Sequence, residues 1–152
     1  MDCRILATCV LIWASSAWAG AWDAGSFDND DALDWVWELS ESDDLSVVED
    51  ALQSAAVASD YLEAPTANMA IAAAEVVAAL TGSPRPELPA EVTNWIKAHP
   101  LAVTDDLVRT ARKAIENIKN VESSELAQLW TESEEMAEVW HADLGDLLQR
   151  LE

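Results

Sequence analysis

Residues 67–80, with the sequence ANMAIAAAEVVAAL, constrain the fold more than any other part of the chain. Apolar side chains, mostly alanine, occupy nearly every position of this segment, and Glu75 is its one charged residue. A helix that is apolar on all sides is stable only when other elements cover it, so the segment predicts a buried, central helix. We expect Thr66 to cap its first turn and Gly82 to end it.

The rest of the chain also has helical periodicity, without strand-like alternation. Further helices are expected over residues 28–40, 45–63 and 90–98. Another helix is expected to begin after a cap at Thr104. The last is expected over residues 124–151, where Gly145 can bend or split it. The first of these is capped by Asp28 or Asn29, and its apolar surface is expected from Ala32, Leu33, Trp35, Val36 and Leu39. Three prolines within residues 83–89 predict an extended connector between the two halves of the domain. The pattern predicts an all-α, single-domain helical bundle of five to seven helices over residues 20–152, with a long C-terminal helix.

Residues 1–19 have the parts of a cleavable signal peptide. Arg4 precedes an apolar run over residues 5–13, and Ala17 and Ala19 form the small-x-small pattern that a signal peptidase recognises. We expect cleavage between Ala19 and Gly20, export to the periplasm or the medium, and no stable membrane anchor after cleavage. An uncleaved anchor is the weaker alternative, because the apolar run is shorter than the roughly 20 residues that cross a bilayer.

Charge restricts the partners of the chain. The 29 acidic and 8 basic residues give a net charge of −21, and the loss of Asp2 and Arg4 with the signal peptide leaves this value unchanged. So acidic a surface repels phosphate backbones and anionic lipid headgroups, which argues against nucleic acid as a partner. Cationic proteins, cations and neutral ligands remain. Both cysteines, Cys3 and Cys9, precede the cleavage site, so the mature chain is expected to hold no disulfide or thiolate site.

The stretch after the cleavage site, GAWDAGSFDNDDALDWVWEL, is rich in aromatic and acidic residues. Its glycines allow the chain to turn, and Trp22 and Phe27 can pin it to the core. Asp28 or Asn29 can cap the first helix, and the acidic residues that follow favour the helix dipole. A structural role is the favoured interpretation, although a binding surface for this segment stays open.

Asp30, Asp34 and Glu38 are spaced four residues apart, so they lie on one face of the first helix. Like charges at this spacing repel each other by about 0.2 to 0.5 kcal/mol per pair. A solvated acidic face is the ordinary explanation, whereas a bound cation or a basic partner would relieve the repulsion. The candidate interaction residues are Trp22, Phe27, Asp28, Asn29, Asp30, Asp34 and Glu38.

Glu75 is the candidate for a buried acid. A lone carboxylate in an apolar helix is costly, so it needs a cation, hydrogen bonds or a proton. The candidate cations are Arg85, Lys97, Arg109 and Arg112. A structural ion pair is favoured over a catalytic acid, because the sequence offers no second catalytic group.

The two histidines give weak signals. Glu138 and His141 have the Glu-x-x-His spacing of di-iron helices, but such sites need a second copy, and the sequence has none. His99, directly before Pro100, is expected on the surface or at a helix end. The sequence also lacks a phosphate-binding glycine loop, a Gly-x-Ser-x-Gly motif and a His-Glu-x-x-His motif. We therefore assign no catalytic, metal or cofactor-binding residue.

A family resemblance rests on residues that follow the expected cleavage site. They are Gly20-Ala21-Trp22, Gly25, Phe27-Asp28-Asn29-Asp30 and Ala32-Leu33, followed by AIAAAEVVAAL, PELP and the C-terminal Leu-Trp and Leu-Leu-x-Arg-Leu. On these motifs the chain resembles the largely bacterial domain of unknown function 4259 over residues 20–152. Family members carry glycine where this chain has Asp23. The resemblance implies no activity, and it supports cleavage after Ala19 because the family pattern begins there.

Export, a charge of −21 and the lack of a catalytic motif favour an acidic, helical binding module with a basic protein partner. A small hydrolase or metal-assisted enzyme centred on Glu75, or on a cluster with His99 or His141, is the first alternative. The second alternative is a low-affinity cation-binding protein. Calcium should then raise its melting temperature more than sodium does at matched ionic strength.

Overall fold

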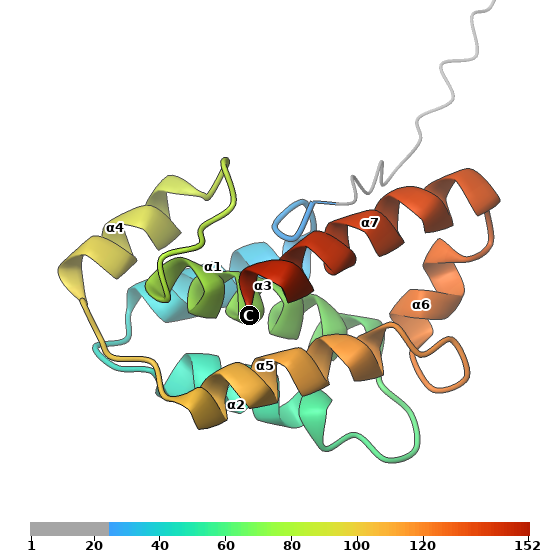
Figure 1. Ribbon diagram of the computed structural model, residues 1–152, viewed down its shortest axis with the longest axis horizontal. Coiled ribbons are helices and arrows are strands. Elements are labelled where there is room, and N and C mark those ends of the chain that lie inside the picture. Colours follow the sequence, from blue (N-terminus) through green and yellow to red (C-terminus); the bar gives the residue numbers. More distant parts are fainter. Residues whose placement is uncertain (1–24) are drawn as a thin grey trace, which may run out of the picture.

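The computed structural model describes residues 25–152 of the chain (Figure 1). These residues form α1 (Asp30–Ser40), α2 (Ser46–Ala56), α3 (Ala64–Leu80), α4 (Ala90–Ala98), α5 (Asp105–Ile118), α6 (Glu125–Trp130) and α7 (Glu134–Arg150). Within the described range there is no strand, and one isolated backbone bridge joins Leu62 to Ser124. In the same range, no helix has both the length and the apolar character of a membrane span. The predicted all-α, single-domain class with five to seven helices is confirmed.

The central helix is α3, as its apolar sequence predicts. Twelve of its seventeen residues are buried, and α1, α2, α4, α5, α6 and α7 all contact it. Figure 1 shows it between α7 and α5. Its fully buried alanines are Ala67, Ala70, Ala72, Ala73, Ala74 and Ala78. Because these side chains are small, the backbones of the surrounding helices can approach closely, and one helix supplies the packing surface for the others.

The side chain of Asn29 caps α1. Its oxygen accepts a hydrogen bond of 2.8 Å from the backbone N–H of Ala32. Of the two predicted caps, Asn29 is therefore the one used, and Asp28 lies exposed in the turn before it. In that turn the N–H of Asp28 donates to the carbonyl of Gly25. A β-carbon at Gly25 would meet the Asp28 carboxylate, so a larger residue there would have to displace this exposed side chain.

Leu33 was expected on the apolar side of α1, and this prediction is wrong. The residue is 51% exposed, whereas Leu39 is fully buried. The twist of the helix places Leu33 on the outer surface together with Trp37, one turn later, which is 70% exposed. The outer face of α1 is therefore partly apolar.

The helix expected over residues 45–63 is too long, since α2 ends at Ala56. The amide of Asn117, on α5, donates to the carbonyls of the last two residues of α2 at 3.0 and 3.1 Å. Farther along, the backbone of Leu62 makes hydrogen bonds of 2.8 and 2.9 Å to the segment at the start of α6. These tertiary partners satisfy polar groups that a longer helix would have paired internally.

The first turn of α3 also differs from the prediction, because Thr66 does not cap it. The helix starts at Ala64, whose N–H donates to the carboxylate of Glu125, on α6, at 2.7 Å. Pro65 fits this first turn because the N–H that it lacks has no helical acceptor there. At the other end, Gly82 has a φ of 94°, a conformation that favours glycine, and residues 83–89 run without helix to α4.

The long C-terminal helix expected over residues 124–151 is two helices, α6 and α7. The break falls at residues 131–133, and Gly145 lies inside α7. Across the break the indole rings of Trp130 and Trp140 stack, with centroids 6.3 Å apart. The regular spacing of apolar residues over this region therefore reflects two helices that bury their apolar faces in one core.

The two leucines of α1 provide a test of this packing. Leu39→Ala should destabilise the protein by about 2 to 5 kcal/mol, because it leaves a cavity in the core. Leu33→Ala, the same change at an exposed position of the same helix, should alter the free energy of unfolding by about 0.5 kcal/mol or less. Urea unfolding followed by circular dichroism measures both, and equal losses would contradict the assigned orientation of α1.

Candidate functional site

Glu75 is fully buried, and both of its carboxylate oxygens are paired. Arg150, at the end of α7, donates to Oε2 at 2.7 Å and to Oε1 at 2.9 Å, which makes a bidentate ion pair. Arg85, in the connector, lies 3.3 Å from Oε1, and the hydroxyl of Ser26 donates to the same oxygen at 2.9 Å. Arg85 also donates to the Ser26 hydroxyl at 2.7 Å. The buried charge is therefore neutralised and fully hydrogen-bonded.

Of the cations expected near Glu75, only Arg85 is in contact with it among the described residues. Arg109 pairs with Asp106 on α5, Arg112 donates to the carbonyl of Leu148 at 2.9 Å, and Lys97 is exposed on α4. Arg150 was not expected. It lies 75 positions from Glu75 in the sequence, so only tertiary packing brings the two together.

Two further carboxylates surround the arginines. Arg150 donates from Nε to Asp146 at 2.7 Å, and Asp143 lies 3.6 Å from Arg85. Burial raises the pKa of Asp143; the charge of Arg85 opposes this shift, and the charge of Glu75 adds to it. The hydrogen bonds of Arg150 to Glu75 raise the pKa of its guanidinium, so it stays charged. Asp143 is thus the member of this cluster whose ionised form the surroundings disfavour.

The histidines stand apart from this cluster. The Nδ1 atom of His99 lies 3.0 Å from the carbonyl of Trp95 at the end of α4, and Nε2 lies 3.6 Å from Asp43. His141 is exposed on α7 beside Trp140. Within residues 25–152, no hydrogen bond or ion pair links either histidine to Glu75, and no three acidic, histidine or cysteine side chains are placed to hold a metal ion.

Six of the seven predicted interaction residues lie at the start of the described chain or on α1. Phe27 is 7% exposed and belongs to the core, and Asn29 is the helix cap. Asp30, Asp34 and Glu38 are exposed on α1, as is Asp28 in the turn before the helix. Trp22 lies outside the described residues. The structure therefore divides this set into structural residues and an exposed acidic group.

Trp37 belongs to the same outer face, although it is not among the predicted interaction residues. It lies seven residues after Asp30 and three after Asp34, so helical spacing alone could have placed it there. Trp37 and Leu33 add exposed apolar surface beside the three carboxylates of this face. We call Asp30, Leu33, Asp34, Trp37 and Glu38 the acidic–aromatic face.

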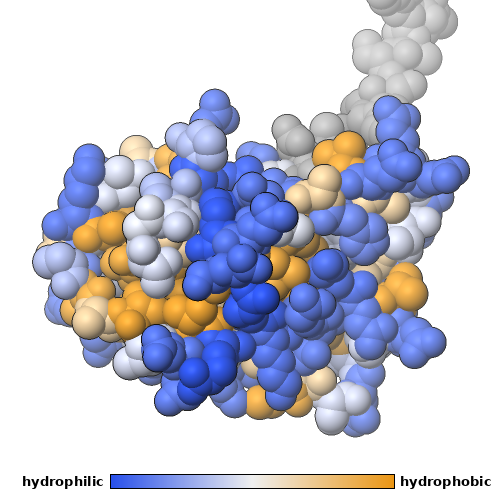
Figure 2. Space-filling model, viewed as in Figure 1, coloured by the Kyte–Doolittle hydropathy of each residue, from blue (hydrophilic) through white to orange (hydrophobic). Residues whose placement is uncertain are grey.

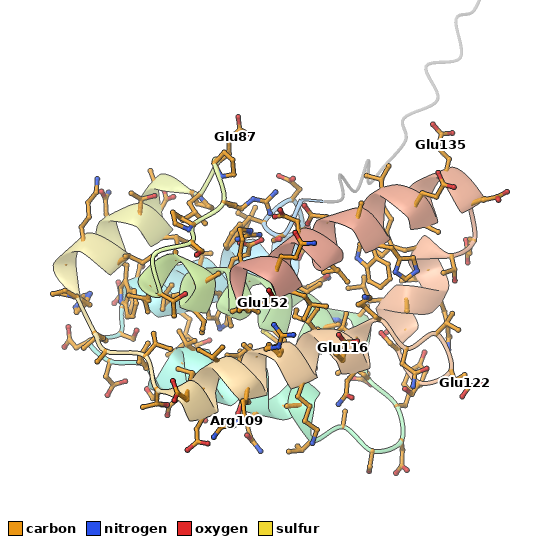
Figure 3. The ribbon with its side chains drawn as sticks, in the orientation of Figure 1. Glu87, Arg109, Glu116, Glu122, Glu135 and Glu152 are labelled. Carbon is orange, nitrogen blue, oxygen red and sulfur yellow. The ribbon has the colours of Figure 1, made fainter. Side chains whose placement is uncertain are left out.

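The remaining surface is acidic in many places. Figure 3 shows Glu87, Glu122 and Glu135 pointing outward from three separate elements. The side of the molecule that carries α5 and α7 is mostly hydrophilic, with an apolar area between α4 and α5 (Figure 2). Acidity by itself therefore does not distinguish α1; the exposed indole among its carboxylates does.

Two cavities open beside α2. One, of about 220 Å³, lies where α1, α2 and α3 meet, and the other, of about 340 Å³, lies between α2 and α5. Trp35 lines the first cavity, and its indole nitrogen has no hydrogen-bond partner among the described residues. A buried N–H without an acceptor costs about 1 to 3 kcal/mol. These cavities could not be predicted from the sequence, because they depend on how the helices are arranged.

Removing the charge of Glu75 tests the buried ion pair. Glu75→Gln keeps the shape of the side chain but leaves two arginines without their shared carboxylate, so the protein should lose about 3 to 5 kcal/mol of stability. Glu138→Gln is the matched control at an exposed position of α7 and should change stability by about 0.5 kcal/mol or less. Similar unfolding midpoints in urea for the two variants would contradict a structural role for Glu75.

The pH dependence of Asp143→Asn tests the shifted carboxyl. Because the folded-state pKa of Asp143 is raised, its contribution to stability is fully present below the ordinary value of 3.8 and is lost as pH rises through the folded-state value. Asp143→Asn should therefore be more stable than the unmodified protein at pH 7, and the difference should shrink as pH falls toward 3.8. Unfolding curves of the two proteins at each pH measure this difference. If Asp143→Asn were less stable than the unmodified protein at pH 7, the raised pKa of Asp143 would be contradicted.

Comparison with known proteins found no match among curated proteins and none among solved structures. A family model described as Domain of unknown function (DUF4259) matches residues 20–143. The matched range contains Ser26, Glu75, Arg85 and the acidic–aromatic face, whereas Arg150 follows it. Since the match covers most of the sequence, the chain belongs to the family described as domain of unknown function (DUF4259).

Proposed function

We propose that this protein is an exported binding module that holds a cationic protein segment on the acidic–aromatic face of α1. The observation that carries the proposal is the 70% exposed indole of Trp37 among three exposed carboxylates. No lysine or arginine occurs in α1 to compensate them. A single helix face thus combines a flat aromatic surface with uncompensated negative charge.

Electrostatic repulsion within this face favours a cationic partner. Asp30, Asp34 and Glu38 repel one another along the helix, and the rest of a chain with a net charge of −21 adds to the same field. A lysine or arginine side chain placed between two of these carboxylates removes part of the repulsion when it binds. The attraction also speeds association at low ionic strength and weakens as salt is added.

Trp37 gives the face an attraction that does not depend on net charge alone. A cation over an indole ring gains about 0.5 to 1 kcal/mol at an exposed site. Tryptophan is enriched at the centre of protein interfaces, where it buries a large area at little cost in side-chain entropy. Leu33, beside it, extends the apolar part of the surface. A basic segment with apolar residues therefore fits this face better than a free ion does.

The alternative functions gain less support from the contacts. In an enzyme centred on Glu75, the carboxylate would have to exchange protons or bind substrate, yet both of its oxygens are engaged by arginines and Ser26. For a cation-binding protein, the described residues offer no cluster that could hold a metal ion. A basic protein segment needs neither a free buried acid nor clustered ligands.

Binding of a lysine- and arginine-rich peptide tests the proposal, with affinity measured by titration calorimetry at low and high salt. Neutralising the face with Asp30→Asn, Asp34→Asn and Glu38→Gln should weaken binding roughly tenfold, since each exposed ion pair contributes about 0.2 to 1 kcal/mol. Trp37→Ala should weaken it by about two- to fivefold through loss of the cation–π contact.

The matched control is Glu116→Gln, Glu122→Gln and Glu135→Gln, which removes the same charge from exposed positions on other elements. This variant should lose much less affinity than the α1 variant. Equal losses would show that net charge alone attracts the peptide, and no binding at low salt would reject the proposed function.

A further inference from the structure

One side of α7 carries two exposed apolar side chains. Met136 is 40% exposed and Val139 is 55% exposed. Residues three, four and seven positions apart lie on the same side of a helix, so both residues share this side of α7 with Asp143. Single exposed apolar residues are ordinary on a protein surface, whereas neighbours at helical spacing form a continuous strip. We call Met136 and Val139 the apolar strip of α7.

The described part of the chain begins beside this side of α7. The guanidinium of Arg85 lies 3.6 Å from the carboxylate of Asp143 and donates to the hydroxyl of Ser26 at 2.7 Å. Ser26 is 4% exposed, and its hydroxyl also donates to Glu75 at 2.9 Å. One arginine therefore connects the turn before α1 to the same side of α7 that carries the apolar strip, and Figure 1 shows this turn beside α7.

The residues before Gly25 are long enough to reach the strip. An extended chain spans about 3.3 to 3.6 Å per residue, so the backbone of Trp22 can lie up to roughly 10 Å from Gly25. Along the axis of α7, Val139 lies about 6 Å and Met136 about 10.5 Å from the level of Asp143, at a rise of 1.5 Å per residue. The strip is therefore within reach of Trp22.

The composition of this short segment identifies the side chain that fits. Residues 20–24 read Gly-Ala-Trp-Asp-Ala, in which tryptophan is the one large apolar residue. An indole buries about 150 to 250 Å² when it packs against apolar surface, and the sulfur of a methionine makes favourable contacts with an aromatic ring. A tryptophan therefore matches a strip made of one methionine and one valine.

The segment of the same chain is a better occupant than a second copy of the protein. Each copy carries a net charge of −21, so two copies repel each other when their surfaces approach. The segment before Gly25 is covalently tethered next to the strip, so its effective concentration there is high without any further contact.

We propose that the segment of residues 20–24 docks on α7, with the indole of Trp22 packed on the apolar strip. Ser26, through Arg85, and Trp22, through the strip, then hold the start of the domain to α7 at two successive points. The inference does not rest on the proposed function, because the acidic–aromatic face of α1 takes no part in it. It assigns the strip to the chain itself rather than to an external partner.

NMR of the isotopically labelled protein tests the contact. The indole N–H signal of Trp22, assigned with Trp22→Phe, belongs to a ring that should show nuclear Overhauser contacts to the methyl groups of Met136 and Val139. Val139→Ser should shift this signal, whereas Val57→Ser, a matched change at a valine that is 57% exposed at the end of α2, should leave it unchanged. Absence of these contacts, or equal shifts in both variants, would overturn the proposal.

A mixture of labelled and unlabelled protein distinguishes the chain's own segment from a second copy. Contacts detected only between chains should not include Trp22 with α7, and their presence would overturn docking within one chain.

Urea unfolding provides an independent measurement of the same contact. Trp22→Ala should lower the unfolding midpoint of the unmodified protein and lower it much less in the Val139→Ser background, because residues in contact have coupled effects on stability. The same decrease in both backgrounds would show that the two side chains do not interact and would overturn the proposal. Trp22 follows the expected cleavage site, so the test applies whether or not residues 1–19 have been removed.

Discussion

The buried carboxylate of Glu75 joins the parts of this fold that are most distant in sequence. It pairs with Arg85 in the connector and Arg150 at the end of α7, and it accepts a hydrogen bond from Ser26 near the start of the described chain. Two of the eight basic residues of a chain with a net charge of −21 are used here. Because an unpaired buried charge is strongly destabilising, this cluster fixes the position of the connector and of α7 against α3.

The carboxylate inside the molecule is paired with cations, whereas those on the surface of α1 are not. Glu75 is neutralised by two arginines, whereas the carboxylates of α1 face solvent without a cation of their own helix. Two arginines neutralise this buried acid, whereas α1 has no basic residue to offset its own negative charge. An external cation therefore has more to gain at α1 than at Glu75, and this makes the outer face of α1, rather than the buried acid, the better candidate for binding.

The Trp-Val-Trp sequence of α1 links the core to the surface. Trp35 points inward, is 3% exposed and lines a cavity, while Trp37, two residues later, is 70% exposed. Two residues turn an α-helix by more than half a circle, so one short segment supplies both a core residue and a surface residue. The proposed binding face therefore lies on the same helix as a core tryptophan, which is only two residues from Trp37.

The sequence by itself determined the local features: the helical class, the buried central helix with its one acid, the cap at Thr104, and the shared face of Asp30, Asp34 and Glu38. These follow from the helical period and from the cost of burying charge, which act within a few residues. Only the tertiary structure decided where α2 ends, where α3 begins and which cations meet Glu75, because the partners, Asn117, Glu125 and Arg150, come from distant positions. It also decided the cavity beside Trp35, since the space between three helices depends on their packing and not on the sequence of any one of them.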